Sequence, residues 1–248
     1  MVKIDVIMYH QVGMFEYNIK THRANYCHVQ RFKQQIYLLK KAGYKTISLD
    51  ILYKYLIGEK VELPKKSVIL TFDDGYENFY QYAFPVLQDS GFSAIVYLIA
   101  NKIGGVTDWF EAKNRETATL MSLEKIRELM KYGVEFGSHG TDHLKLTNVD
   151  KKVARKDIFE SKKILEDMLG KEIRHFCYPY GDHNIDIMNF VKEAGFKTGV
   201  TCERGTVTKN VDPYAIPRKA VSLGDSILGF AWKLFFKNNP KRELLKLE

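Results

Sequence analysis

The sequence has few cysteines and no long apolar run. Cys27, Cys177 and Cys202 are the only cysteines among 248 residues, and three widely spaced cysteines exclude a disulfide-built scaffold. We expect them to be buried or half-buried thiols. No apolar run approaches the roughly 20 residues that span a bilayer. The opening stretch, MVKIDVIMYH, is interrupted by Lys3 and Asp5, so it predicts a strand rather than a secretory signal, and the expected compartment is the cytoplasm.

The composition is that of a globular protein. Hydrophobic residues make up 45% and charged residues 27%, which excludes disorder, collagen and coiled coil as the class of the whole chain. The length of 248 residues fits one large domain or two small ones. The 38 basic and 30 acidic residues give a net charge of +8, which suits an acidic glycan, a phospholipid surface or a nucleic acid. No nucleic-acid recognition motif accompanies this charge, so we expect no nucleic-acid partner.

Short apolar runs alternate with helix-length amphipathic stretches along most of the chain. The expected strands cover residues 2–9, 67–72, 94–100, 134–137, 173–178, 197–201 and 215–221. The expected helices cover residues 28–42, 49–57, 78–88, 122–132, 150–169 and 185–194, with a long loop over 101–120. Pro85 predicts a kink or a restart within its helix. This alternation predicts an α/β fold with a parallel sheet, and about seven strands favour a barrel over an open sheet.

Two adjacent carboxylates follow the apolar strand 67–72. Asp73 and Asp74 come directly after this strand and before Gly75. A lone Asp-Asp-Gly is typical of a turn. Like charges this close raise the pKa of one carboxylate unless a cation intervenes. In the functional interpretation the two carboxylates point in different directions. One carboxylate would then ligate the cation while the other handles a proton.

Two histidines follow the strand 134–137 in the segment SHGTDH (138–143). A lone pair of histidines four apart is a weak signal, and surface histidines are common. If the segment starts a helix, however, His139 and His143 lie on one face and can offer two imidazoles to one metal. Together with Asp74 they would form a three-ligand site with open positions, which is the pattern of a catalytic metal site.

Two further strand ends carry polar groups. Strand 173–178 continues into Pro-Tyr-Gly-Asp at 179–182, which alone indicates a tight turn, and strand 2–9 continues into His10, which alone indicates a core histidine. The carboxyl ends of parallel strands meet at one end of the fold, where α/β proteins carry their sites. Four polar strand ends together therefore favour a shared site over four unrelated turns.

These motifs resemble those of the polysaccharide deacetylase family, also called the NodB-homology or carbohydrate esterase family 4 fold. The matching segments are TFDDG (71–75), SHGTDH (138–143), YPYG (178–181) and IPR (216–218). The resemblance covers roughly residues 4–221. It implies a deformed (β/α) barrel, a divalent metal that is usually zinc, and hydrolysis of an N-acetyl group on an amino sugar. We therefore expect a catalytic domain over residues 1–222 and an amphipathic basic tail over 223–248.

The resemblance also implies a role for each matching residue. Asp73 matches the family's general base. Asp74, His139 and His143 match its metal ligands. Tyr180 matches the residue whose backbone N–H helps to hold the oxyanion.

Two features depart from the family's usual pattern. The usual arginine before Pro-Tyr is absent, because Cys-Tyr (177–178) precedes Pro179; as in the subgroup that reads YPYG, Arg218 of IPR is expected to orient Asp73. The usual C-terminal leucine–histidine motif is also missing. In similar chains that begin with a strand and Tyr-His, the acid histidine comes from the N-terminus, which implies that His10 is the general acid.

Three functions stay open from the sequence. The first is a metal-dependent hydrolase that removes N-acetyl groups from a glycan or a lipid-linked amino sugar and releases acetate. The second is a glycosidase with two carboxylates, but those lie about 5–10 Å apart across a sugar, which the adjacent Asp73 and Asp74 suit poorly. The third is a non-catalytic carbohydrate-binding relic of the fold, against which the retained ligands and base argue.

The C-terminal segment 226–248 is apolar and aromatic at first and basic afterwards. One interpretation is a helix packed on the barrel. The other is a peripheral membrane anchor, which would suit a lipid-linked or membrane-proximal glycan. In that case aromatic rings lie in the headgroup zone and basic side chains face anionic lipid; these are Trp232, Phe235 and Phe236, and Lys233, Lys237, Lys241 and Arg242.

Overall fold

A computed structural model describes residues 3–16, 22–109 and 117–247 of the chain. Its centre is one parallel sheet with strand order β10-β1-β5-β6-β7-β8-β9, and a further strand, β4, pairs with β5. The strands are β1 (Lys3–Tyr9), β4 (Lys45–Thr46), β5 (Lys66–Phe72), β6 (Ile95–Leu98), β7 (Glu135–Ser138), β8 (His175–Cys177), β9 (Thr198–Val200) and β10 (Lys219–Ala220). The expected α/β fold with a parallel sheet is confirmed.

The sheet curls into a deformed half-barrel of seven parallel strands, as the sequence predicts. A parallel bridge between Val200 and Ile216 joins the end of β9 to the segment that leads into β10, and this contact draws the two edges of the sheet together. The central strands β5 and β6 are largely apolar runs because both of their faces are buried. In β5 six of the seven residues are buried.

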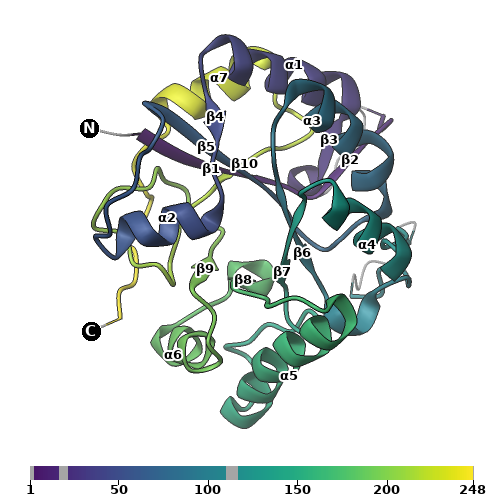
Figure 1. Ribbon diagram of the computed structural model, residues 1–248, viewed down its shortest axis with the longest axis vertical. Coiled ribbons are helices and arrows are strands. Elements are labelled where there is room, and N and C mark those ends of the chain that lie inside the picture. The colour runs from purple at the N-terminus through teal and green to yellow at the C-terminus, as the bar shows by residue number, and fades with distance from the viewer. Residues whose placement is uncertain (1–2, 17–21, 110–116, 248) are drawn as a thin grey trace.

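Helices cover the outside of the curled sheet (Figure 1). They are α1 (Val29–Lys41), α2 (Leu49–Leu56), α3 (Phe84–Ser90), α4 (Leu123–Lys131), α5 (Lys151–Leu169), α6 (Ile185–Glu193) and α7 (Ile227–Phe236). Several begin at a side chain that accepts a hydrogen bond from the first turn. These caps include Ser122 before α4, Asp150 before α5 and Asn184 before α6, and such a cap satisfies a backbone N–H that the helix itself cannot pair.

The short elements are the ones that the sequence did not predict. A separate two-stranded parallel sheet pairs β2 (Gln11–Gly13) with β3 (Tyr26–His28). The remaining turns are η1 (Arg23–Asn25), η2 (Phe79–Ala83), η3 (Ala100–Lys102) and η4 (Pro179–Gly181), of which η2 is a π-helix and the others are 3-10 turns. Strands of two or three residues are too short to show a period of two in the sequence.

Several predicted boundaries differ from the structure. The helix expected over 78–88 is a π-helix followed by α3, and Pro85 lies in the first turn of α3, so it marks a restart. The last expected strand, over 215–221, shrinks to the two residues of β10. Within the long loop expected over 101–120, Val106 pairs with Thr119 in an isolated bridge. Residue 2 of the first expected strand, residues 110–116 of this loop and residue 248 of the tail lie outside the described residues.

The C-terminal helix α7 packs on the barrel through one face. Phe230 and Leu234 are buried, and α7 lies against α1 (Figure 1). The ammonium group of Lys233 donates to the Asp225 carboxylate at 2.6 Å and to the Ala220 carbonyl at 2.9 Å. Lys233 therefore binds the protein, contrary to the idea that it faces lipid. No helix within the described ranges is long and apolar enough to cross a membrane.

Candidate active site

The register of the sheet brings the polar strand ends to the same level. Tyr9 at the end of β1 is paired with Phe72 at the end of β5, so His10 and Asp73 leave the sheet side by side. Ser138 at the end of β7 is paired with Phe176 of β8. Hence the residues that follow these strands lie around one end of the barrel, as the sequence predicts.

Asp73 and Asp74 diverge because the chain turns sharply between them. The Asp73 N–H donates to the Tyr9 carbonyl at 3.0 Å and so prolongs the pairing of β5 with β1. Asp74 then adopts a left-handed backbone with φ of 74°, which is uncommon outside glycine and asparagine and costs on the order of 1 kcal/mol or more. Gly75 follows with φ of 73°. The turn aims the two carboxylates at different partners, and both are buried.

The two histidines converge on Asp74. The Nε2 atoms of His139 and His143 lie 3.2 Å and 3.4 Å from the same atom, Asp74 Oδ1. The segment that carries them does not start a helix, which was the condition under which the sequence placed both rings on one face. It is a loop in which Gly140 has φ of 78° and His143 has φ of 58°, so these backbone turns, and not helical spacing, bring the rings together.

These three side chains fit a divalent metal. Their ligand atoms all lie within 4.8 Å of one another, and the exposed fractions of Asp74, His139 and His143 are only 3%, 2% and 7%. No hydrogen-bond partner reaches Asp74 Oδ1 from the part of the chain that the structure describes, which is costly for a buried oxygen unless a cation binds there. Two imidazole nitrogens and one carboxylate oxygen form a ligand set typical of zinc.

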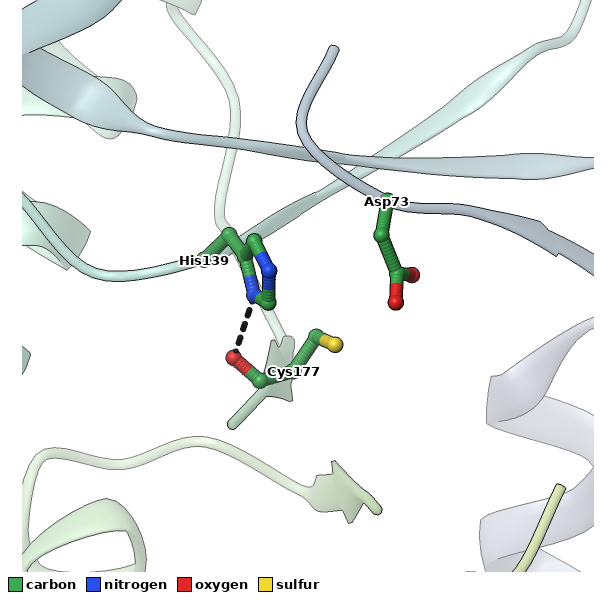
Figure 2. A group of neighbouring side chains, drawn as sticks. All are labelled: Asp73, His139 and Cys177. Carbon is green, nitrogen blue, oxygen red and sulfur yellow. Dashed lines mark hydrogen bonds between the residues drawn. The ribbon is translucent and has the colours of Figure 1, made fainter. Parts of the chain in front are cut away.

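A backbone carbonyl orients one of the ligands. His139 Nδ1 lies 2.8 Å from the Cys177 carbonyl oxygen, and the dashed line in Figure 2 marks this hydrogen bond. Because a carbonyl oxygen only accepts, the Nδ1–H of His139 donates, and the Nε2 lone pair remains for a metal. Ligating histidines in metal sites are usually held in this way.

The charges around these ligands favour a cation. Burial alone raises the pKa of Asp74, but the neighbouring imidazoles of His139 and His143 outweigh it and hold this pKa well below its usual range. Burial lowers the pKa of His143, which favours the neutral imidazole that a metal needs. Burial also acts to lower the pKa of His139, but Cys177 and Asp74 raise it well above its usual value. The carboxylate thus stays ionised and attracts positive charge at this point.

Arg218 binds Asp73 at two points. Its Nη1 donates to Oδ1 at 2.7 Å and its Nη2 donates to Oδ2 at 2.8 Å, and the exposed fraction of Arg218 is 1%. Burial acts to raise the pKa of Asp73, but the Arg218 guanidinium outweighs it, so this pKa lies below its ordinary value. Asp73 is therefore an ionised carboxylate with a fixed orientation.

His10 lies close to the Asp73 carboxylate. Its Nε2 is 3.9 Å from Asp73 Oδ2, and its side chain is 16% exposed. The buried Nδ1 has no hydrogen-bond partner among the described residues. The His10 side chain is thus partly exposed, while its Nδ1 edge is buried.

The turn that contains Tyr180 lies next to the proposed ligand His143. Tyr180 has φ of 60° within η4, and its ring lies 4.4 Å from that of His143, centroid to centroid. The indole ring of Trp109 lies 4.8 Å from the same histidine ring. Two aromatic side chains therefore flank His143. The sequence predicted a role for the Tyr180 backbone but none for Trp109, which stands in a segment without regular periodicity.

Residues beside the proposed ligands have supporting contacts. Asp182 accepts hydrogen bonds from the backbone N–H and the hydroxyl of Thr147, so it joins the turn after β8 to the loop after β7. His183 Nδ1 lies 2.7 Å from the Gly181 carbonyl. Cys177 contacts the site twice, because its thiol lies 3.3 Å from Arg218 Nη2 and its carbonyl binds His139. In Figure 2 its sulfur and the Asp73 carboxylate point into the same space.

Comparison with known proteins agrees with this geometry. Residues 60–199 match the family model described as polysaccharide deacetylase, which is more than half of the chain. The chain belongs to the polysaccharide deacetylase family. It is thus a carbohydrate-active hydrolase that removes acetyl groups from the amino sugars of a glycan, in a family whose members depend on a metal.

Curated polysaccharide deacetylases include similar chains. The poly-beta-1,6-N-acetyl-D-glucosamine N-deacetylase of Staphylococcus epidermidis is 36% identical over 202 residues, which are 78% of this chain and 67% of that protein. The enzyme of the same name from Staphylococcus aureus is 30% identical over 201 residues, 77% of this chain and 66% of that protein. The chain therefore spans about two thirds of the length of these relatives.

Solved structures share the fold. IcaB from Ammonifex degensii is 25% identical, has a TM-score of 0.79 and aligns over 94% of this chain and 97% of that chain. The deacetylase PplD of Streptococcus pyogenes, solved with acetate, is 24% identical, has a TM-score of 0.77 and aligns over 94% and 98% of the two chains. The shared fold thus extends over 94% of this chain in both comparisons.

Proposed function

We propose that this polysaccharide deacetylase hydrolyses the N-acetyl amide of an amino sugar with Zn²⁺ bound by Asp74, His139 and His143. One observation carries the proposal: Asp74 Oδ1 faces two imidazole nitrogens at 3.2 Å and 3.4 Å, while the neighbouring Asp73 is hydrogen-bonded to Arg218. Adjacent carboxylates with separate partners suit separate tasks. Such an ion, when bound, polarises the carbonyl and makes water more acidic.

Asp73 is the proposed general base. It accepts the proton of the attacking water, whose oxygen adds to the carbonyl carbon. Arg218 keeps the Asp73 carboxylate ionised and fixes its two oxygens, so no reorientation is needed when the proton moves. Because the pKa of Asp73 lies below its ordinary value, the base form persists well into the acid range.

His10 and Tyr180 complete the proposed reaction. As the carbonyl becomes tetrahedral, its oxygen gains negative charge, and the Tyr180 backbone N–H would donate to it; such a donor contributes about 3 kcal/mol. The C–N bond then breaks, and His10 donates a proton to the departing nitrogen. The products are acetate and a free amino sugar. The 3.9 Å between His10 Nε2 and Asp73 Oδ2 leaves the acid and the base next to one another around one reacting centre.

The first substrate to test is a polymer of β-1,6-linked N-acetylglucosamine. This choice rests on the names of the two staphylococcal relatives, which are 36% and 30% identical to this chain. Chitooligosaccharides and a lipid-linked N-acetyl amino sugar serve as the comparison substrates.

Acetate release and metal content test the proposed function together. We expect the purified full chain to bind one Zn²⁺, to lose activity on dialysis against a chelator, and to regain it with Zn²⁺ or Co²⁺. Asp74→Ala should bind no metal at the site and release no acetate, with Asp167→Ala, at an exposed aspartate of α5, as the control. New reducing ends without acetate would identify a glycosidase, and sugar binding without either product would identify a binding relic. Each of those results overturns the proposal.

We further propose that the exposed face of α7 contacts a membrane surface peripherally. Leu228, Trp232 and Phe236 stand four residues apart and are 79%, 53% and 66% exposed, and the rings of Trp232 and Phe236 stack at 4.6 Å. Lys241 and Arg242, both exposed, follow the helix. An apolar aromatic stripe next to basic side chains suits the headgroup zone of an anionic bilayer.

Vesicle sedimentation tests this contact. We expect the full chain to pellet with vesicles that contain phosphatidylglycerol more than with neutral vesicles, and less so in high salt because screening weakens the attraction. The double variant Trp232→Ser/Phe236→Ser should stay in solution. Tyr132→Ser, which removes an aromatic ring that is 58% exposed elsewhere, is the control. Equal soluble fractions with and without vesicles would reject the contact.

A further inference from the structure

The loop that carries both histidine ligands is held by backbone hydrogen bonds on one side. Its carbonyl groups accept from the turn η3: the Gly140 carbonyl binds the Ala100 N–H at 3.0 Å, and the Thr141 carbonyl binds the Asn101 N–H at 3.1 Å. The Asn101 side chain also donates to the Asp142 carboxylate at 3.1 Å. The loop is therefore anchored through its acceptors, and its donors need partners elsewhere.

A single carboxylate on α5 supplies those partners. Asp157 accepts the Thr141 N–H at 3.1 Å, the Asp142 N–H at 3.3 Å and the Thr141 hydroxyl. Its exposed fraction is 3%, and no cation pairs with it within the described ranges. A buried carboxylate without a cation is costly unless several donors solvate it, and here the donors come from the loop alone.

The carboxylate also fits the shape of the loop. Gly140 has φ of 78°, and a Cβ atom at this position would lie 2.5 Å from Asp157 Oδ2. The absence of a side chain at Gly140 thus lets the carboxylate approach the backbone between His139 and His143. One turn further along α5, the Ser161 hydroxyl lies 2.7 Å from that of Ser138 at the end of β7. The buried face of α5 therefore binds the segment 138–142 through Asp157 and Ser161.

We propose that Asp157 is a positioning residue of the metal centre: by binding the donors of the loop between His139 and His143, it holds both imidazoles in the arrangement that binds the ion. The inference rests on the proposed metal site. No hydrogen bond or ion pair joins Asp157 to either histidine within the described ranges, so its effect passes through the backbone. A supporting residue of this kind typically changes metal affinity about 10- to 100-fold.

The test measures metal affinity on folded, metal-free protein. We expect Asp157→Asn to bind Zn²⁺ about 10- to 100-fold more weakly than the wild type by competition with a chromophoric chelator. The visible spectrum of its Co²⁺ form should also change, because the ligand geometry changes. Asp167→Asn, a variant at an exposed aspartate of the same helix, should behave as the wild type.

A purely structural role predicts a different result. In that case Asp157→Asn lowers the melting temperature of the metal-free protein but leaves Zn²⁺ affinity and the Co²⁺ spectrum unchanged, and the inference is overturned. If Asp157→Asn does not fold, Thr141→Val removes one donor to the same carboxylate, and an unchanged affinity there is equally decisive against it. Failure of the wild type to bind Zn²⁺ would instead overturn the proposed function.

Discussion

Arg218 and Asp73 form a buried two-point ion pair across 145 positions of the chain. The same guanidinium donates to the Thr201 carbonyl at 2.8 Å and to the Thr71 hydroxyl at 3.0 Å, and its Nη2 lies 3.3 Å from the Cys177 sulfur. Every nitrogen of the guanidinium therefore has a partner. A guanidinium held at so many points fixes the position of the Asp73 carboxylate and keeps it ionised.

Arg218→Lys should lower kcat/KM about 100-fold and move its acid limb to higher pH. The ammonium keeps the charge but cannot bind both oxygens, so less opposes the burial that acts to raise the pKa of Asp73. A higher pKa means that less Asp73 is ionised at a given acid pH, which gives the sign of the shift. The measurement is the pH profile of acetate release, with Arg242→Lys as the control. An acid limb at the wild-type pH would contradict the role of this pair.

Asp73→Asn should keep the metal and lose the reaction. The amide is nearly isosteric, and Asp73 is not among the proposed ligands, so one Zn²⁺ per chain is expected. Without a base, turnover should fall about 10²- to 10⁴-fold. Elemental analysis and acetate release on the same sample check both parts. Wild-type turnover in this variant would show that another group accepts the proton.

The convergence of the site could be predicted from the sequence because parallel strands share a polarity. Asp73, His139, Tyr180 and His10 all follow apolar strands, and the structure places them at one end of the barrel, with β1 and β5 ending in register at Tyr9 and Phe72. The pattern of apolar strands followed directly by polar residues is thus enough to locate such a site.

What the pattern could not predict is how the loops turn and what holds them. The segment after His139, for which the sequence left a helix start open, is a loop with left-handed turns, and Asp157 accepts hydrogen bonds from its backbone N–H groups. Asp157 lies on the buried face of α5. A charged residue at such a position was the sequence signal that could have pointed to its role. The partner of Arg218 is far away in sequence, so only the family resemblance pointed to it.

His10→Asn should separate the leaving-group step from the other steps. Metal content should be unchanged, because His10 lies outside the proposed ligand set. Amide hydrolysis should fall about 10²- to 10⁴-fold, since an amine leaves only when protonated. Hydrolysis of an activated aryl acetate, whose leaving group needs no proton, should fall far less. Equal losses on the amide and the ester would assign His10 a task other than that of the acid, and loss of metal would make it a ligand.

His175 should make the fold less stable below pH 6.5. It lies on β8, away from the site, and its Nδ1 is 2.9 Å from the Thr198 hydroxyl. Burial first, and then the cations Arg174 and Lys197, lower its pKa from 6.5 to about 3. Asp50 lies 3.5 Å from Nε2 but is also paired with Arg174, so it does not offset the burial.

The sign follows from which state binds the proton. Between pH 6.5 and about 3 the unfolded chain protonates this imidazole and the folded chain does not, so the free energy of unfolding falls as the pH falls. At pH 5 the loss is about 2 kcal/mol relative to neutral pH. His175→Asn removes this dependence, so urea unfolding at pH 7.5 and pH 5 should show about 2 kcal/mol more acid loss in the wild type than in the variant. Parallel losses in the two proteins would mean that the folded state accepts a proton at His175 after all.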